Sequence, residues 1–170
     1  MNIHTVILAA GEGSRMLSNK AKSLQPIGGQ SMLRRIYANV VDITHSTSFV
    51  VGFEKEAVLD EIKQFDGKIY SCEQKQAIGT ADAVKSALST ISDESIVVVL
   101  YGDVPLIKKE TIKGLISNSD KGLTILSTIM ENPHGYGRVK KDNEGHALAI
   151  IEEKDATDND KKIKEVITGI

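Results

Sequence analysis

The sequence predicts an α/β fold: a mostly parallel, Rossmann-like sheet flanked by helices, with an antiparallel extension. Apolar runs of strand length alternate with amphipathic segments of helix length as far as about residue 117. This alternation is typical of parallel sheets joined by crossover helices. Beyond that point, strand-like runs follow one another without a helix, which indicates antiparallel pairing. Since 170 residues suffice for one sizeable core, we expect one domain over residues 1–170.

The elements of the first part are predicted from local signals. Ile3–Ala9 is a short apolar run that ends before a glycine, as a buried strand does. Ser31 is a suitable N-cap for the next helix, because five apolar side chains between residues 32 and 40 share one face. The other expected elements are strands at Thr47–Gly52, Lys68–Cys72 and Ser95–Tyr101, helices at Glu54–Gln64 and Lys109–Ser117, and a helix from Thr80 that buries Ala83, Val84, Ala87 and Leu88.

Ser95–Tyr101 is the most apolar strand, so we expect it to lie in the centre of the sheet with both faces covered. The later strands are expected at Leu123–Met130, Gly137–Lys140 and Ala147–Glu153, with a turn at Asp142–Gly145. The charged segment Lys154–Lys164 is expected to be a solvated loop or a surface helix.

Composition excludes several classes of protein. A net charge of −2 gives no basic field toward nucleic acid or an anionic membrane, and aromatic residues are too scarce for a base-stacking RNA binder. Cys72 is the single cysteine, which fits a reducing compartment, and we expect it to be a small buried residue at a strand end. The first apolar run is too short for a signal peptide or a membrane span. We therefore expect a cytoplasmic protein without nucleic-acid or membrane partners, and we expect none of its four histidines to bind zinc.

The turn after the first strand carries the strongest functional signal. Gly11 and Gly13 leave backbone N–H groups uncovered, and Arg15 and Lys22 add two cations, which together suit a polyphosphate. Two general phosphate motifs do not fit. The P-loop needs a lysine and a serine or threonine directly after its second glycine, and the dinucleotide fingerprint needs a third glycine where Met16 stands.

Five motifs along the chain form a more specific pattern. They are Leu8-Ala9-Ala10-Gly11-x-Gly13-x-Arg15-Met16 followed by Lys22, Gln74 with Gly79-Thr80, Tyr101-Gly102-Asp103-Val104-Pro105-Leu106, Gly135-Tyr136-Gly137-Arg138, and Glu152-x-Lys154-Asp155-Ala156-Thr157. In this order and spacing they resemble the sugar-phosphate nucleotidyltransferases, and among them the uridylyltransferase domain of the bifunctional bacterial enzymes that make UDP-N-acetylglucosamine. The resemblance runs from the first strand to the last residue and implies the nucleotide-diphospho-sugar transferase fold.

The resemblance implies a reaction in which UTP and N-acetylglucosamine-1-phosphate give UDP-N-acetylglucosamine and pyrophosphate, with Mg²⁺ as cofactor. The protein then mainly aligns the reactants and neutralises charge. The implied catalytic residues are Arg15 on the β- and γ-phosphates, Lys22 between the α-phosphate and the sugar phosphate, and Asp103 as the metal ligand. The implied substrate-binding residues are Leu8, Ala9, Ala10, Gly11, Gly13 and Lys22 toward the nucleotide, Gln74 and Gly79 toward uracil, and Thr80, Tyr101, Gly102, Asp103, Gly137 and Glu152 around the sugar phosphate.

Asp103 has support of its own from the residues around it. It follows the strand Ser95–Tyr101, at the carboxyl edge of the expected sheet, where ligand sites of α/β proteins lie. A carboxylate there suits Mg²⁺, which takes few protein ligands and keeps water and phosphate as the others. The competing interpretation is an Asx-turn before Pro105. Arg138 is expected either to add positive potential or to face water.

The chain departs from the family toward its end. Ile167 stands where the family usually has an asparagine that contacts the sugar, so the identity of the sugar stays open. Val166–Ile170 resembles a strand just begun, and we expect the chain to be part of a longer protein whose relatives add a second metal-holding residue and a trimer-forming acetyltransferase region. Three alternatives remain: a nucleotide-binding module with little turnover, a sibling enzyme for another base or sugar, and a nicotinamide-dependent oxidoreductase, which would lack its third glycine and ribose-binding acid.

Overall fold

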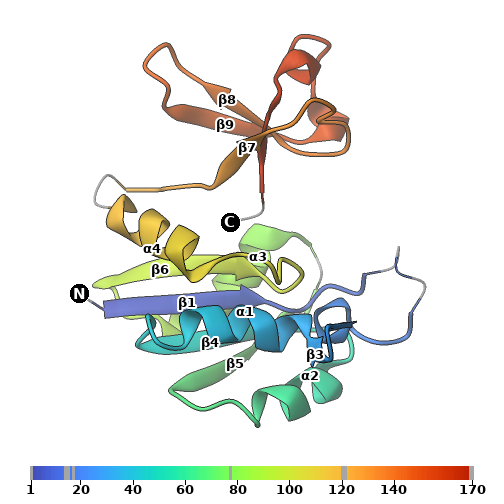
Figure 1. The fold of residues 1–170 in the computed structure, drawn as a ribbon, viewed down its shortest axis with the longest axis vertical. Helices are drawn as coiled ribbons and strands as arrows, with labels where there is room; N and C mark the ends of the chain where they lie inside the picture. Colours follow the sequence, from blue (N-terminus) through green and yellow to red (C-terminus); the bar gives the residue numbers. More distant parts are fainter. Residues whose placement is uncertain (1, 14–15, 17, 77, 120–121, 169–170) are drawn as a thin grey trace. The chain divides into compact units, whose positions relative to one another are not determined.

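The computed structural model describes residues 2–13, 16, 18–76, 78–119 and 122–168, and its elements are labelled in Figure 1. Contacts between residues divide the chain into two compact units, residues 1–120 and 121–170. Within the described ranges, no helix is long and apolar enough to cross a membrane.

A four-stranded parallel sheet forms the centre of the first unit (Figure 1). Its strands are β1 (Asn2–Leu8), β4 (Ser46–Val51), β5 (Ile69–Glu73) and β6 (Ser95–Tyr101). They lie in the order β5-β4-β1-β6, so the chain adds strands on one side of β1 and then returns to add β6 on the other. The sequence prediction of a parallel sheet is confirmed. Because all carboxyl ends share one edge, the reversal at β1 and β6 creates the kind of crevice in which α/β proteins bind ligands.

The expected central position of β6 is wrong for this sheet. Among the described residues β1 is its hydrogen-bonded neighbour, and β6 is the outer strand. Val98 and Leu100 are buried, whereas Val97 is 39% exposed. The burial alternates along the strand, so one face is covered more completely than the other. An apolar run therefore shows that a segment suits a sheet, but it does not show how many strands pair with it.

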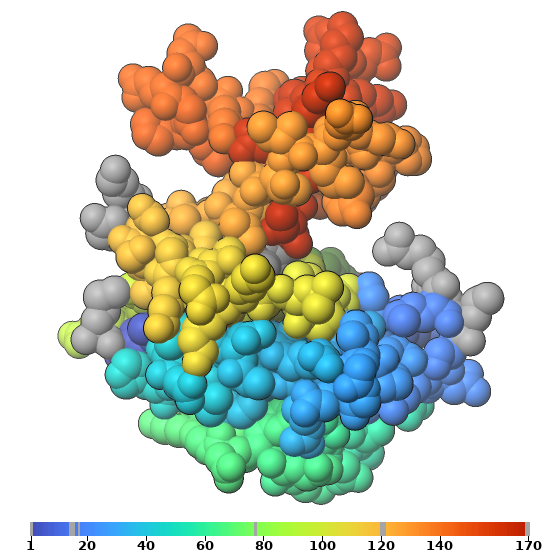
Figure 2. All heavy atoms as spheres, viewed as in Figure 1, coloured from blue at the N-terminus to red at the C-terminus, as the bar shows by residue number. Residues whose placement is uncertain are grey.

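Helices cover both faces of this sheet. They are α1 (Met32–Val40), α2 (Lys55–Ile62), α3 (Thr80–Ser86) and α4 (Lys109–Ser117). Tyr37 of α1 packs against Phe49, with ring centroids 5.5 Å apart. Ala83 of α3 instead packs in a cluster with Val50 and Cys72, and Cys72 is the small buried residue that the sequence predicted. Phe49 and Val50 are successive strand residues and point to opposite faces, so α1 and α3 lie on opposite sides. Figure 2 shows atoms of the α1 and α4 segments on the near side of this unit.

The helix signals are confirmed in most places. The Ser31 hydroxyl caps α1 by accepting a hydrogen bond from the backbone N–H of Arg34 at 3.1 Å. The five apolar residues predicted to face inward from α1 are all buried, and α4 has its predicted bounds. Leu88 is an exception, because α3 ends at Ser86 and a 3₁₀ turn follows. That turn leaves Leu88 56% exposed, contrary to expectation.

A buried histidine links β1 to β4. His4 is 1% exposed, and its two ring nitrogens lie 2.8 Å from the Ser46 hydroxyl and 2.9 Å from the Ser48 hydroxyl. Burial, and after it the positive charge of Lys68, lowers the pKa of His4. The folded state therefore favours the neutral ring.

The second unit is the predicted antiparallel extension. Its strands are β7 (Ser127–Ile129), β8 (Arg138–Lys141), β9 (Ala147–Ile151) and β10 (Glu165–Ile167), in the order β7-β10-β8-β9. The predicted turn at Asp142–Gly145 joins β8 to β9, and the Gly145 N–H donates to the Asp142 carbonyl at 3.2 Å. Between β9 and β10 the chain forms two short 3₁₀ turns, Glu153–Asp155 and Asp160–Lys162. The strand predicted at Leu123–Met130 is shorter, because only its last part pairs with β10.

This unit buries a cation. Arg138 is 2% exposed, donates from Nη2 to the Glu153 carboxylate at 2.7 Å, and also donates from Nη1 to the Tyr136 carbonyl. The hydrogen bond from Arg138 is the main cause of a lowered pKa at Glu153. The expectations that Arg138 adds positive potential or faces water are both wrong. The side chain is buried, and the Glu153 carboxylate neutralises its charge.

Candidate functional site

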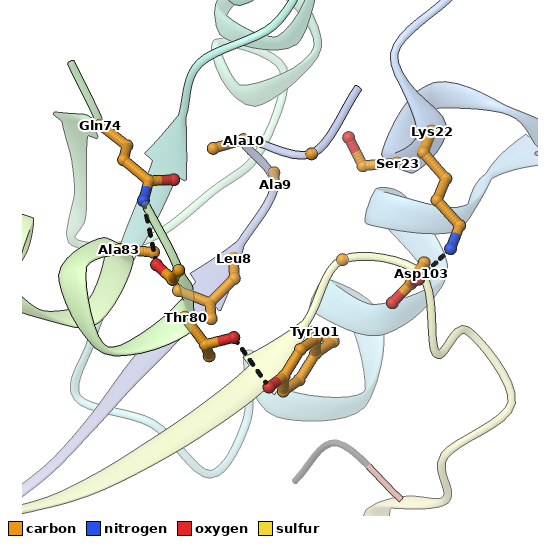
Figure 3. A pocket seen from close by; sticks show the side chains of 13 residues that line it. Leu8, Ala9, Ala10, Lys22, Ser23, Gln74, Thr80, Ala83, Tyr101 and Asp103 are labelled. Atoms are coloured by element: carbon orange, nitrogen blue, oxygen red, sulfur yellow. Dashed lines mark hydrogen bonds and ion pairs between the residues drawn. The ribbon is translucent and has the colours of Figure 1, made fainter. Parts of the chain in front are cut away.

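A pocket of about 270 Å³ opens at the carboxyl ends of the parallel strands (Figure 3). The segments after β1, β5 and β6 line it, together with α3 and the 3₁₀ turn Lys22–Leu24. Its lining residues are Leu8, Ala9, Ala10, Gly11, Lys22, Ser23, Gln74, Gly79, Thr80, Ala83, Tyr101, Gly102 and Asp103. All but Ser23 and Ala83 are residues that the sequence analysis assigned to a site.

The two unassigned residues have different signals. Ala83 lies one helical turn after Thr80, so its position in the pocket follows from helix spacing. Ser23 follows Lys22 in the same 3₁₀ turn and is 3% exposed. Its hydroxyl is buried without a hydrogen-bond partner, which no local pattern indicates.

The end of β1 and the loop after β6 meet in the lining of the pocket. The Gly102 N–H donates to the Leu8 carbonyl at 2.8 Å. A Cβ at Gly102 would lie 2.7 Å from that carbonyl oxygen and 3.3 Å from the Ala9 Cα. A glycine at this position therefore lets the two backbones approach closely enough to form one wall.

Lys22 and Asp103 form an ion pair on one side of the pocket (Figure 3). Their side chains are 32% and 30% exposed, so a ligand can reach both charges. Gly13 does not line the pocket but lies against the stem of Lys22, because a Cβ there would be 2.8 Å from the Lys22 Cβ. The site thus offers a cation for phosphate and a carboxylate for a hard divalent cation.

The opposite side of the pocket is polar but uncharged. The Gln74 amide nitrogen donates to the Gly79 carbonyl at 3.1 Å. The Tyr101 hydroxyl donates to the Thr80 hydroxyl at 3.3 Å. The two hydrogen bonds tie Gly79 and the first residue of α3 to the edge of the sheet (Figure 3).

The other predicted site residues lie elsewhere in the chain. Arg15 lies outside the described residues. Gly137 and Glu152 belong to the second unit, where a Cβ at Gly137 would be 3.7 Å from the Glu152 carboxylate and 3.3 Å from Ile167. These two of the residues predicted around the sugar therefore lie together, with Ile167 beside Gly137.

His146 has acidic neighbours that the sequence did not predict. Its ring nitrogen and carboxylate oxygens of Asp142 and Glu144 lie within 4.8 Å of one another. The Asp142 carboxylate accepts backbone hydrogen bonds from Glu144 and His146 at 2.9 Å each, and these bonds contribute to its lowered pKa. This carboxylate orders the turn between β8 and β9.

The fold and the pocket define a class of protein. A parallel sheet, a glycine-containing loop after its first strand, and a lysine and an aspartate at its switch point are features of α/β proteins that bind nucleotides.

Comparison with known proteins gives the family. Residues 5–149 match the family of MobA-like NTP transferase domains. The chain therefore belongs to that family and is a nucleotidyltransferase. The resemblance recognised from the motifs is confirmed, because curated relatives carry the name Bifunctional protein GlmU. That of Ruthia magnifica is 46% identical over 99% of this chain, and that of Francisella philomiragia is 43% identical over 100% of it.

The matches also define what part of those relatives the chain represents. It spans 37% of the length of both curated proteins. Among solved structures, the crystal structure of HddC from Yersinia pseudotuberculosis is similar, with a TM-score of 0.70 and 23% identity over 89% of this chain and 69% of that one. At this identity the likeness shows the fold alone, and it agrees with the predicted fold class.

Proposed function

We propose that the pocket binds UTP and that the protein transfers UMP to N-acetylglucosamine-1-phosphate, giving UDP-N-acetylglucosamine and pyrophosphate. The observation that carries this proposal is the meeting of Lys22, Gln74 and Asp103 in one pocket at the switch point of the sheet. The five motifs and the similarity to GlmU proteins over nearly the whole chain support these substrates. We further propose that both units belong to one nucleotidyltransferase domain over residues 1–170.

The residues take roles that follow from their chemistry. A phosphate oxygen of the sugar phosphate forms a bond to the α-phosphorus of UTP, and the bond from that phosphorus to the bridging oxygen breaks with its electron pair leaving on pyrophosphate. Lys22 neutralises charge on the α-phosphate and the incoming phosphate. The uncovered backbone at Ala10 and Gly11 lies beside the phosphates, and Gln74 faces the base. The role of Arg15 on the β- and γ-phosphates stays a prediction.

Asp103 is the residue that fits a magnesium ion. Its side chain lines the pocket and is 30% exposed, so this carboxylate would hold the ion while water and phosphate oxygens can still reach it. When bound, Mg²⁺ supplies charge neutralisation on the phosphate oxygens. In the protein itself, Lys22 neutralises the carboxylate instead.

The sugar is the less defined substrate. We place the hydroxyl groups of the sugar at Gly137 and Glu152, because the Glu152 carboxylate lies beside Gly137 and its oxygens can accept hydrogen bonds from hydroxyl groups. Ile167 lies next to Gly137 and has no hydrogen-bonding side chain. Selection among amino sugars therefore depends on the other groups of this cluster.

The release of pyrophosphate from UTP tests the proposal. We expect release that requires both N-acetylglucosamine-1-phosphate and Mg²⁺, and a loss of about 100-fold in Asp103→Asn. Asp60→Asn is the matched control, because that aspartate is 71% exposed and its carboxylate pairs with Lys63. UTP binding without any release would instead favour a nucleotide-binding module. Faster reaction with CTP or dTTP than with UTP would refute the assignment of the base.

A further inference from the structure

Two hydrogen-bond acceptors hold the side-chain amide of Gln74 in place through its nitrogen. Its nitrogen donates to the Gly79 carbonyl at 3.1 Å and to the Asp82 carboxylate at 3.2 Å. Figure 3 shows the amide nitrogen turned toward α3 and the amide oxygen on the side of Ala10. Within the described part of the chain, no hydrogen bond to that oxygen is found, so it is left to a ligand.

The chemistry of the two partners fixes which end of the amide faces them. A carbonyl oxygen and a carboxylate only accept hydrogen bonds. If the Gln74 amide turned over, its oxygen would face two other oxygens with no hydrogen between them. Gly79 and Asp82 therefore both favour the orientation in which Gln74 presents its amide oxygen, a hydrogen-bond acceptor, to the pocket.

An acceptor at this position distinguishes pyrimidine bases. The N3 atom of uracil carries a hydrogen and donates, whereas the N3 atom of cytosine has a lone pair and accepts. A fixed amide oxygen accepts a hydrogen bond from N3 of uracil, but it is repelled by the lone pair on N3 of cytosine. A buried or oriented polar group that loses its partner discriminates far more strongly than a change of shape does.

We propose that Asp82 is a positioning residue for base selection: it holds the Gln74 amide nitrogen, so that the pocket prefers a uracil nucleotide over a cytosine nucleotide. Asp82 lies in the first turn of α3, is half-buried, and is not among the residues that line the nucleotide pocket. It therefore acts through Gln74 and not by contact with the base. This inference rests on the proposed function only in that Gln74 faces the base.

The ratio of the affinities for UTP and CTP tests the role of Asp82. We expect Asp82→Asn to lower the preference for UTP about tenfold, mainly by a gain in CTP affinity measured by titration calorimetry. The reason is that an asparagine can present either its oxygen or its nitrogen, and so can support either orientation of Gln74. Asp82→Ala is expected to lower the ratio less, about threefold, because the Gly79 carbonyl still holds the amide nitrogen.

A purely structural effect of these substitutions has a different signature. It would weaken binding of both nucleotides together and leave their ratio unchanged. Asp60→Asn removes an exposed carboxylate from α2 and is expected to leave both affinities and their ratio as in the wild type. Melting curves of the two Asp82 variants establish that they are folded, and either folded variant suffices for the test.

Gln74→Ala separates a failure of this inference from a failure of the proposed function. If Gln74→Ala keeps the wild-type ratio, or if the wild type does not prefer UTP, Gln74 does not select the base. Both the role of Asp82 and the assignment of Gln74 to the base in the proposed function are then overturned. If Gln74→Ala loses the preference but folded Asp82→Asn and Asp82→Ala keep it within twofold, Asp82 has no positioning role and the proposed function stands. A fall of the ratio in Gln74→Ala and in Asp82→Asn supports both.

Discussion

Replacement of Gly102 by alanine tests whether the close approach of two loops shapes the pocket. The added Cβ would lie 2.7 Å from the Leu8 carbonyl oxygen and 3.3 Å from both the Ala9 Cα and the Ser23 Cβ. The nearest of these atoms belongs to backbone that is itself hydrogen-bonded to the Gly102 N–H at 2.8 Å. The methyl group can be accommodated only if the end of β6 moves away from β1.

The expected effects concern stability and ligand binding. Overpacking of this kind costs about 1–3 kcal/mol, so we expect Gly102→Ala to lower the free energy of unfolding by about 2 kcal/mol in urea denaturation. Asp103 is the next residue and moves with the backbone. A displacement of about 1 Å in a reacting site can cost about 100-fold in rate, and we expect pyrophosphate release to fall by that order.

Gly114→Ala is the matched control. Gly114 is an exposed residue inside α4, and a Cβ there would meet nothing within 4 Å. The same substitution is therefore expected to raise the free energy of unfolding by about 0.5–1 kcal/mol, since glycine is unfavourable within a helix. The steric reasoning is refuted if Gly102→Ala unfolds at the urea concentration of the wild type and keeps its UTP affinity.

Three further predictions concern single side chains. Because burial lowers the pKa of His4 below its usual 6.5, the unfolded chain takes up this proton first, and stability falls as the pH drops through about 6.5 toward the lower pKa of the folded state. His4→Gln should lose this part of the pH dependence in urea denaturation at about pH 7.5 and about pH 5.5, whereas exposed His146→Gln should keep it. Ser23→Ala removes a buried hydroxyl without a partner and should stabilise the fold by about 1 kcal/mol, and a loss of stability would show that the hydroxyl is bonded. Lys22→Met leaves the Asp103 carboxylate without its ion pair and should raise the Mn²⁺ affinity of the nucleotide-free protein by about three- to fivefold in calorimetry, so an unchanged affinity would contradict competition between lysine and metal.

The elements that rest on local signals are predictable from the sequence. The cap at Ser31 and the apolar face of α1 are set by residues within three turns of chain, and the structure reproduces both. The position of β6 and the burial of Arg138 are set by pairing across the sheet and by Glu153, which lies 15 residues away. Neither follows from periodicity, because each depends on which segments the topology brings together.

The candidate site divides in the same way. Asp103 was predictable from its own position, because it follows a strand of the parallel sheet and the carboxyl ends of such strands meet at one edge. Leu8 and Gln74 were predicted only through the resemblance of the motifs that contain them. Ser23 and Asp82 carry no motif of their own. Ser23 is notable because its buried hydroxyl has no hydrogen-bond partner. Asp82 is notable because it accepts a hydrogen bond from Gln74, eight residues away.

The packing of Gly13 on Lys22 makes two positions, nine apart in the chain, mechanically dependent. Gly13 has a φ of +67°, and any larger residue there would push its first carbon onto the stem of the lysine. A substitution at Gly13 would thus impair the pocket by displacing the side chain of Lys22. In a mutational scan scored by growth, position 13 would report loss of activity although the lysine at position 22 is unchanged.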